Sequence, residues 1–271
     1  MSDIDKIIAD RPFHRFMTIE TVEPLSGSSA VSGQSFIVTT DDRRRFKLRR
    51  CKDAAQAEGI EDTVRRFSHI FPKFYGRDGR YLLLEALDGY RDCTKEDLRR
   101  NARAVGRLCA EINQAESISD HDHERFFRNR MAEILAMGAI DQELHDTAIA
   151  KYLQLIEELE VKVGMDLNDI HPKNFMIDKH GNVLYVDEQG IAYRAKGMGV
   201  ARFLKEQPDD ATWREFETGY QEVAQHSPFT PQYRLLMLLL ETARAIAYRL
   251  RSGNNAHTIP KELEYLRSLV S

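Results

Sequence analysis

One short segment constrains this chain more than any other. Residues 167–187 follow the order loop, strand, turn, strand and loop, within a half of the sequence that otherwise has helical periodicity. Asp169 and Asn174 bracket a loop stiffened by Pro172, and Asp187 ends the second expected strand. We expect the Asp169 and Asn174 side chains to lie on one side of the loop, with Asp187 beside them.

This set of side chains suits phosphoryl transfer from a nucleotide. The reaction depends on positioning and charge neutralisation more than on covalent chemistry. A carboxylate must orient the acceptor hydroxyl and take its proton, and oxygen ligands must hold magnesium against the phosphates. A cation must also bind the phosphates, and a loop of small residues must let backbone amides approach them. The segment supplies the carboxylate and the oxygen ligands.

The two halves of the chain differ in their expected secondary structure. Strands are expected in the first half at 16–22, 35–40, 45–51, 74–75 and 81–87, with one helix at 54–68. Thr94 is a good N-cap, with Asp97 at the third helical position, for a helix that runs to about residue 116. Further helices are expected at 123–138, 141–163, 198–206, 210–225, 231–251 and 260–269.

The run from Asn168 to Asn174, Asn-Asp-Ile-His-Pro-Lys-Asn, resembles a known family motif. It is similar to the His-Gly-Asp-x-His-Pro-x-Asn motif of the aminoglycoside phosphotransferase and choline kinase-like family. His171 favours this group, because protein kinases usually have lysine there. The resemblance implies an α+β, protein kinase-like bilobal fold, with Asp169 as catalytic base and Asn174 and Asp187 as magnesium ligands.

The resemblance covers most of the chain, from about residue 20 to 250, and is strongest at 167–187. It implies a nucleotide-binding, β-rich lobe at 1–87 and a helical lobe at 88–271 that carries the catalytic and metal-binding loops. Residues 82–89 resemble the inter-lobe hinge, whose backbone would pair with the nucleotide base. The remaining nucleotide contacts are expected at the hinge and in the small-residue loop, at Glu85, Leu87, Ser26, Gly27 and Ser28.

Two positions compete to bind the phosphates. Lys47 and Arg49 fall on one face of a strand by period-two alternation. Protein-kinase chemistry favours Lys47, whereas the family's Leu-Arg strand pattern favours Arg49. The carboxylate partner is also ambiguous, because Glu58 and Glu61 lie three residues apart on one helix face; Glu58 is the first choice.

The chain departs from the family pattern at three places. Leu167 and Asn168 replace the usual His-Gly, and Asp187 is followed by Glu188-Gln189-Gly190 rather than by an aromatic residue. A second downstream acid, common in the family, is missing from 198–201. None of these departures removes a required catalytic group.

The composition limits the kinds of partner that we expect for this protein. The formal net charge of -4 and the pI of about 6.2 give no general attraction to nucleic acid or to anionic membranes. The three cysteines have no metal-binding spacing, and no signal peptide or membrane-spanning run is evident, so we expect a cytoplasmic protein. The oligomeric state and any protein partner are not indicated.

The sequence thus predicts a magnesium-dependent phosphotransferase that moves the γ-phosphate of ATP, or of GTP, to a hydroxyl of a small molecule. A catalytically silent nucleotide-binding scaffold and a kinase acting on a protein hydroxyl are the alternatives. The acceptor pocket is expected within 120–140 and 204–245. Four acids there suit a cationic substrate: Asp209, Asp210, Glu215 and Glu217.

Overall fold

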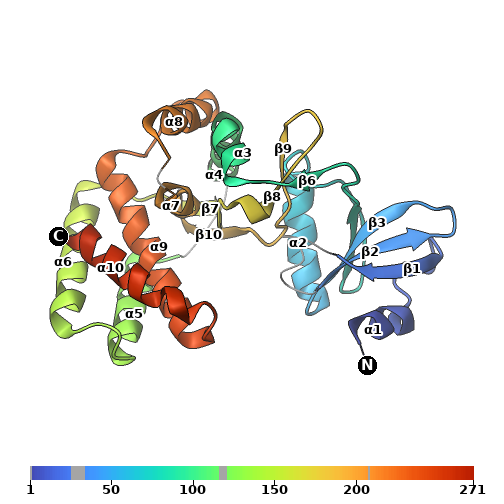
Figure 1. The fold of residues 1–271 in the computed structure, drawn as a ribbon, viewed down its shortest axis with the longest axis horizontal. Coiled ribbons are helices and arrows are strands. Elements are labelled where there is room, and N and C mark those ends of the chain that lie inside the picture. The colour runs from blue at the N-terminus through green and yellow to red at the C-terminus, as the bar shows by residue number, and fades with distance from the viewer. Residues whose placement is uncertain (1, 26–33, 116–120, 207) are drawn as a thin grey trace. The chain divides into compact units, whose positions relative to one another are not determined.

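The computed structural model describes residues 2–25, 34–115, 121–206 and 208–271 and divides into two compact units (Figure 1). The first unit contains Met1–Asn101 and His171–Gly190, and the second contains Ala102–Ile170 and Ile191–Ser271. The expected α+β fold, with an antiparallel sheet in one part and helices in the other, is confirmed. The lobe boundary after residue 87 stays a prediction.

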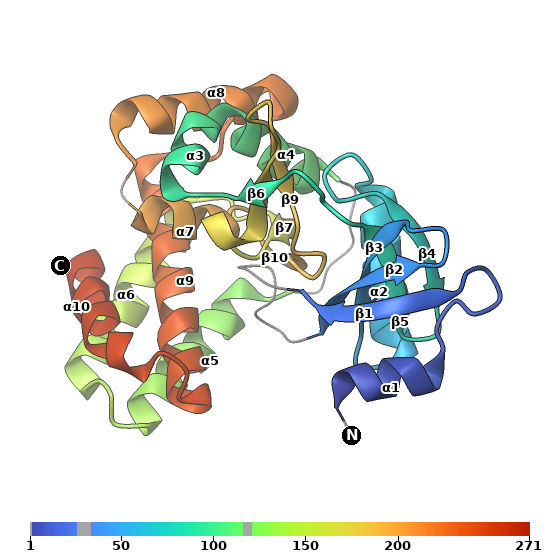
Figure 2. The same ribbon diagram turned by 45° about the vertical axis from the view of Figure 1, so that its right-hand side comes forward.

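A five-stranded antiparallel sheet forms the centre of the first unit. Its strand order is β1-β2-β3-β5-β4. The strands are β1 (Ile19–Pro24), β2 (Ser35–Thr40), β3 (Arg45–Arg50), β4 (Phe74–Asp78) and β5 (Tyr81–Glu85). Helix α2 (Ala54–Arg66) contacts β4 and β5, and α1 (Asp3–Asp10) contacts β1 (Figure 2). The expected strands and the expected helix of this region are therefore present.

Strand β3 shows why this sheet has two different faces. Phe46 and Leu48 belong to an apolar cluster with residues of α1, β2 and β5. Lys47 and Arg49 alternate with them and lie on the opposite face, because successive side chains of a strand point to opposite sides. Both cationic side chains are nevertheless buried. A buried cation needs a partner, so we expect an acceptor of hydrogen bonds to lie against this face of β3.

The expected polar hairpin forms the other part of the first unit. It consists of η2 (Pro172–Asn174), β8 (Phe175–Ile177) and β9 (Val183–Tyr185), with the short strand β6 (Arg91–Asp92) pairing to β8. The apolar residues Phe175 and Tyr185 are opposite each other in the ladder and completely buried. Gly181 has a φ of 87° in the connecting turn, a conformation that favours glycine.

The second unit is mainly helical. Its helices are α4 (Ala102–Gln114), α5 (His123–Ala136), α6 (Gln142–Glu158), α7 (Met198–Lys205), α8 (Asp210–Ala224), α9 (Pro231–Ser252) and α10 (Ile259–Val270). Helices α4 and α8 approach closely at two glycines: a Cβ on Gly106 would overlap the Phe216 carbonyl, and one on Gly219 would overlap the Arg103 carbonyl. None of the helices in the described residues is long and apolar enough to cross a membrane.

Two expected helices were wrong in extent. The Thr94 cap and its capping box with Asp97 are present, but the helix stops, and α3 (Lys95–Arg100) is separated from α4 by Asn101. The expected helix at 141–163 ends at Glu158. A strand that was not expected, β7 (Val163–Leu167), then pairs with β10 (Ile191–Ala195). Pairing with a distant segment decides this strand, and helical periodicity cannot reveal such a partner.

Candidate active site

Two cations of β3 share one carboxylate. Glu188 follows strand β9, and its side chain is completely buried. Its Oε1 accepts a hydrogen bond from Lys47 Nζ at 2.6 Å, and its Oε2 accepts one from Arg49 Nη1 at 2.7 Å. Burial raises the pKa of Glu188, but Lys47 and Arg49 outweigh that effect and hold the pKa below its ordinary value. Glu188 is therefore an anion that holds both cations in place.

The carboxylates expected beside these cations lie elsewhere. Glu58 is exposed on α2. Glu61, the alternative, accepts hydrogen bonds from Arg65 at 2.8 Å and from Arg77 at 2.6 Å. The carboxylate that contacts Lys47 is Glu188, which sequence reasoning noted only as a departure from the family pattern. An acid in place of an aromatic residue was the available signal.

Asn174 and Asp187 are connected through the backbone of the hairpin. The backbone N–H of Val186 donates to the Asn174 carbonyl at 2.9 Å, so Asp187 follows the residue that is paired with Asn174. The Asp187 side chain accepts a hydrogen bond from the Gln189 backbone at 3.2 Å. Burial and the neighbouring Glu188 raise the pKa of Asp187, and Arg49 opposes them in part. A half-buried carboxylate of this kind is stabilised by added positive charge.

The donors of this hairpin fit magnesium better than they fit a softer metal. Asn174 and Asp187 supply an amide oxygen and a carboxylate, the hard ligands that Mg²⁺ takes together with waters and phosphates. The described residues contain no cluster of three or more histidine, cysteine or acidic side chains suited to a metal. Protein ligands this few are typical of metal sites that depend on a phosphate-bearing substrate.

A cavity of about 230 Å³ lies in the same unit. It is lined by Lys47, by Leu25 and Ile37, and by the predicted hinge residues Glu85 and Leu87. Pockets that enclose a whole drug-sized ligand are larger, about 300–1,000 Å³, so this cavity is too small to enclose a whole nucleotide. Among the predicted nucleotide contacts, Lys47, Glu85 and Leu87 are thus brought together. Ser26, Gly27 and Ser28 lie outside the described residues.

Arg49 carries an open donor. Its Nε is buried and has no hydrogen-bond partner among the described residues, although Nη1 is bound to Glu188. An unsatisfied buried donor costs roughly 1–3 kcal/mol, which a phosphate oxygen could offset. The chemistry of this atom therefore fits an anionic ligand.

Asp169 belongs to the second unit. It lies two residues after β7, and its side chain is 23% exposed. Arg202 of α7 approaches it, with Nε at 3.8 Å from Oδ1. The next residue, Ile170, donates its backbone N–H to the Gly199 carbonyl at 3.4 Å. Asp169 is thus a partly exposed carboxylate anchored against the start of α7.

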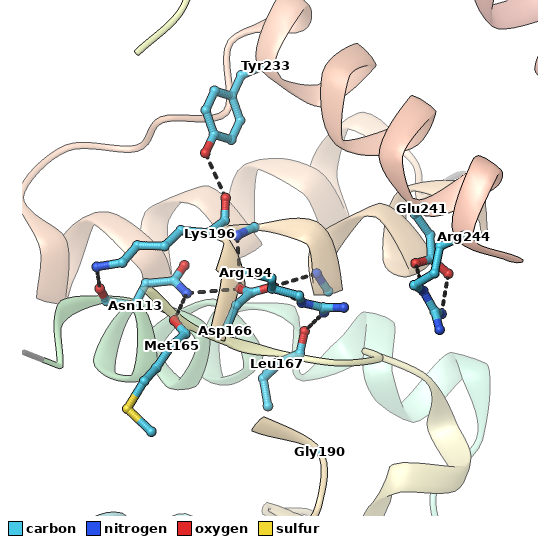
Figure 3. A network of polar contacts seen from close by, with 12 residues as sticks. Asn113, Met165, Asp166, Leu167, Gly190, Arg194, Lys196, Tyr233, Glu241 and Arg244 are labelled. Atoms are coloured by element: carbon cyan, nitrogen blue, oxygen red, sulfur yellow. Dashed lines mark hydrogen bonds and ion pairs between the residues drawn. The ribbon is translucent and has the colours of Figure 1, made fainter. Parts of the chain in front are cut away.

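A second buried carboxylate, Asp166, organises the structure around that loop (Figure 3). It accepts hydrogen bonds from Asn113 Nδ2, from the backbones of Gly197 and Gly199, and from Arg194 Nε, at 2.9 to 3.0 Å. Sequence reasoning missed this residue, because its partners lie on three separate segments. It satisfies the N-terminal amides of α7, which supports the segment bearing Asp169.

The four acids proposed to bind a cationic substrate have mostly structural contacts. Asp209 caps α8 by accepting from Thr212 at 2.7 Å. Glu215 lies 3.9 Å from Arg103, and Glu217 accepts from Ser227 at 3.3 Å. Asp210 lies in the first turn of α8, a favourable place for a negative charge.

Solved structures with the same fold include small-molecule phosphotransferases. The choline kinase LicA from Streptococcus pneumoniae has a TM-score of 0.74 at 13% identity, over 98% of this chain and 100% of the other. A type I macrolide 2′-phosphotransferase has a TM-score of 0.67 at 12% identity, over 98% of each chain. The chain has the protein kinase-like fold of the choline kinase and aminoglycoside phosphotransferase group.

Some proteins of this fold were solved with nucleotides. A GDP complex of an aminoglycoside 2′-phosphotransferase IIIa variant has a TM-score of 0.65 at 12% identity, over 98% of this chain and 95% of the other. LicA was also solved with AMP, and that complex has a TM-score of 0.71 at 12% identity, over 99% of this chain and 100% of the other. No protein-family model matches the sequence, and a search of curated proteins finds no match.

Proposed function

We propose that this protein is a magnesium-dependent phosphotransferase that moves the γ-phosphate of ATP or GTP to a hydroxyl of a small molecule. The observation that carries the proposal is the buried group of Lys47, Arg49 and Glu188, of which Lys47 also lines a cavity together with the hinge residues. A buried cation that lines a cavity, with a second buried cation bound to the same carboxylate, suits the phosphates of a nucleotide. The fold shared with choline kinase and macrolide phosphotransferase supports a small acceptor.

The roles follow from the chemistry of each residue. Lys47 and Arg49 bind the phosphates, and the backbone from Glu85 to Leu87 binds the base. Asn174 and Asp187 hold magnesium, which neutralises phosphate charge when it is bound. Asp169 orients the acceptor hydroxyl and takes its proton. The three buried, free thiols of Cys51, Cys93 and Cys109 are consistent with work in the reducing cytoplasm.

Thermal melting tests nucleotide binding first. Wild type should melt at a higher temperature with ATP or GTP plus magnesium than without, and the nucleotide with the larger shift is the donor. Asp187→Asn should lose the shift, whereas Asp62→Asn, an exposed carboxylate of α2, should keep it. A wild type that does not respond to either nucleotide contradicts the proposal.

An acceptor screen then tests the transfer step. Hydroxylated amines, amino sugars and macrolides are the first compounds to try. Proteins of the same fold are named as kinases of choline and as phosphotransferases of aminoglycosides and macrolides. Transfer by wild type should be lost in Asp169→Ala, while nucleotide binding is retained. The departures at Leu167 and Asn168 favour a silent nucleotide-binding protein as the second candidate. Magnesium-dependent binding without any transfer, to small molecules or to proteins in a lysate, would support that candidate.

A further inference from the structure

The carboxylate that holds the two β3 cations comes from the loop after β9 rather than from helix α2. Glu188 is 141 residues from Lys47 in the chain and 139 from Arg49, and it reaches both through one side chain. The exposed fractions of the Lys47, Arg49 and Glu188 side chains are 8%, 6% and 0%. At such burial each carboxylate oxygen fixes the direction of one cation.

The same carboxylate sets the charge that a phosphate meets. Lys47 and Arg49 contribute two positive charges and Glu188 removes one, so the three residues together carry a net charge of +1. Without the Glu188 charge the group would carry +2. Charges in such a buried group interact more strongly than they do in water, so this difference matters for a ligand that is itself highly charged.

Glu188 is also next in sequence to Asp187, the proposed magnesium ligand. The backbone therefore links the residue that holds the cations to a residue that would hold the metal. Metal-free ATP is more negative than magnesium ATP, and it requires more positive charge from the protein. A group with a net charge of only +1 neutralises little of the negative charge of metal-free ATP. Bound magnesium would supply the additional positive charge.

We infer that Glu188 is a positioning residue that directs Lys47 and Arg49 and offsets one of their charges, which makes nucleotide binding depend on magnesium. The inference rests on the proposed function, because it concerns the same nucleotide site. The role of carboxylate partner to the β3 cations, which the sequence suggested for Glu58 of α2, thus belongs to Glu188 of the metal-binding loop.

The test measures the affinity for ATP by calorimetry, once with magnesium and once with EDTA. Wild type should bind ATP at least about tenfold more tightly with magnesium. In Glu188→Gln this ratio should fall about tenfold, because metal-free ATP binds more tightly to the more positive group. Glu188→Asp, which keeps the charge, should return the ratio toward the wild-type value. Glu96→Gln, an exposed acid of α3, is the matched control and should not change it.

Arg49→Gln provides an independent arm if Glu188→Gln does not fold. It lowers the net charge of the group from +1 to zero, so metal-free ATP should bind less tightly and the ratio should rise. A purely structural role of Glu188 would change the melting temperature without changing the ratio.

Three results would overturn the inference. The ratio in Glu188→Gln equals that of wild type, or the ratio in Arg49→Gln does not rise, or Glu58→Gln lowers the ratio instead. In each case wild type still binds ATP and the proposed function stands. Failure of wild type to bind ATP in either buffer rejects the proposed function itself, and the inference with it.

Discussion

The two units each bury a carboxylate, and the two carboxylates have different surroundings. Asp166 of the second unit is 2% exposed, and Glu188 of the first is 1% exposed. Asp166 is bound by two backbone amides, one side-chain amide and one guanidinium (Figure 3). Glu188 is bound by the ends of two long cationic side chains.

We interpret this difference as one between a structural carboxylate and the functional carboxylate proposed above. The partners of Asp166 are mostly fixed by the backbone, so exchanging them for a ligand would require the chain to refold. The partners of Glu188 have several rotatable bonds, and Arg49 Nε has no acceptor within the part of the chain that the structure describes. Burial alone therefore does not distinguish the two roles; the kind of partner, and whether its hydrogen bonds are all made, does.

Removal of the Asp166 charge should have the largest effect. Asp166→Asn leaves the buried Arg194 without its anion and places an amide against backbone donors. We expect the free energy of unfolding to fall by about 3–5 kcal/mol. Urea denaturation measures it, with Asp210→Asn as a control that should lose less than about 1 kcal/mol. A loss as small as the control's would mean that Asp166 is not a structural centre.

Widening the contact between α4 and α8 should have the next largest effect. Helix α4 carries Asn113, which donates to Asp166, so the packing of α4 supports that network. Gly219→Ala would push its new methyl group into the Arg103 carbonyl, at a cost of about 1–3 kcal/mol. Gly59→Ala of α2, where a Cβ meets nothing within 4 Å, should instead add about 0.5–1 kcal/mol. Equal effects of the two substitutions in urea denaturation would contradict close packing at Gly219.

Asp187→Asn should separate stability from binding in the first unit. The pKa of Asp187 is raised by burial and by Glu188, so its ionised form disfavours the fold above that pKa. The free energy of unfolding without nucleotide should be unchanged or rise by up to about 1 kcal/mol, while the melting shift with magnesium ATP is lost. A large loss of stability in the absence of nucleotide would make Asp187 a structural residue like Asp166.

An exposed carboxylate should have the smallest effect. Glu222 of α8 is paired with Arg103 and Arg107 of α4, and hydrogen bonds from Arg107 and Arg103 lower its pKa to about 2. Its folded pKa is below its unfolded pKa, so the pair stabilises the protein above the unfolded pKa and loses this effect as the pH falls through about 2. The free energy of unfolding of wild type should therefore be slightly larger than that of Glu222→Gln at neutral pH. The difference should shrink in acid and in high salt. A difference that does not depend on pH would indicate lost packing rather than lost charge.

Local sequence determined much of the first unit. The β-branched residues of β2 and the period-two pattern of β3 predicted the two strands, and the bounds of β2 agree with the structure. Turn residues around Gly79 and Gly181 predicted the two hairpins. The Thr94 and Asp97 capping box was also predicted, because both of its hydrogen bonds are made between residues three apart. Features whose partners are near in the chain are readable from the chain.

The choice of partners for buried charges depended on the tertiary structure. The sequence placed Lys47 and Arg49 on one face of a strand, but offered Glu58 and Glu61, three residues apart on one helix face, as the carboxylate. The contact is made by Glu188, and the donors of Asp166 likewise come from segments up to 53 residues away. A buried ion pair needs only proximity in space and desolvation, and neither leaves a periodic trace in the sequence. The tertiary structure alone therefore determines which carboxylate pairs with each buried cation.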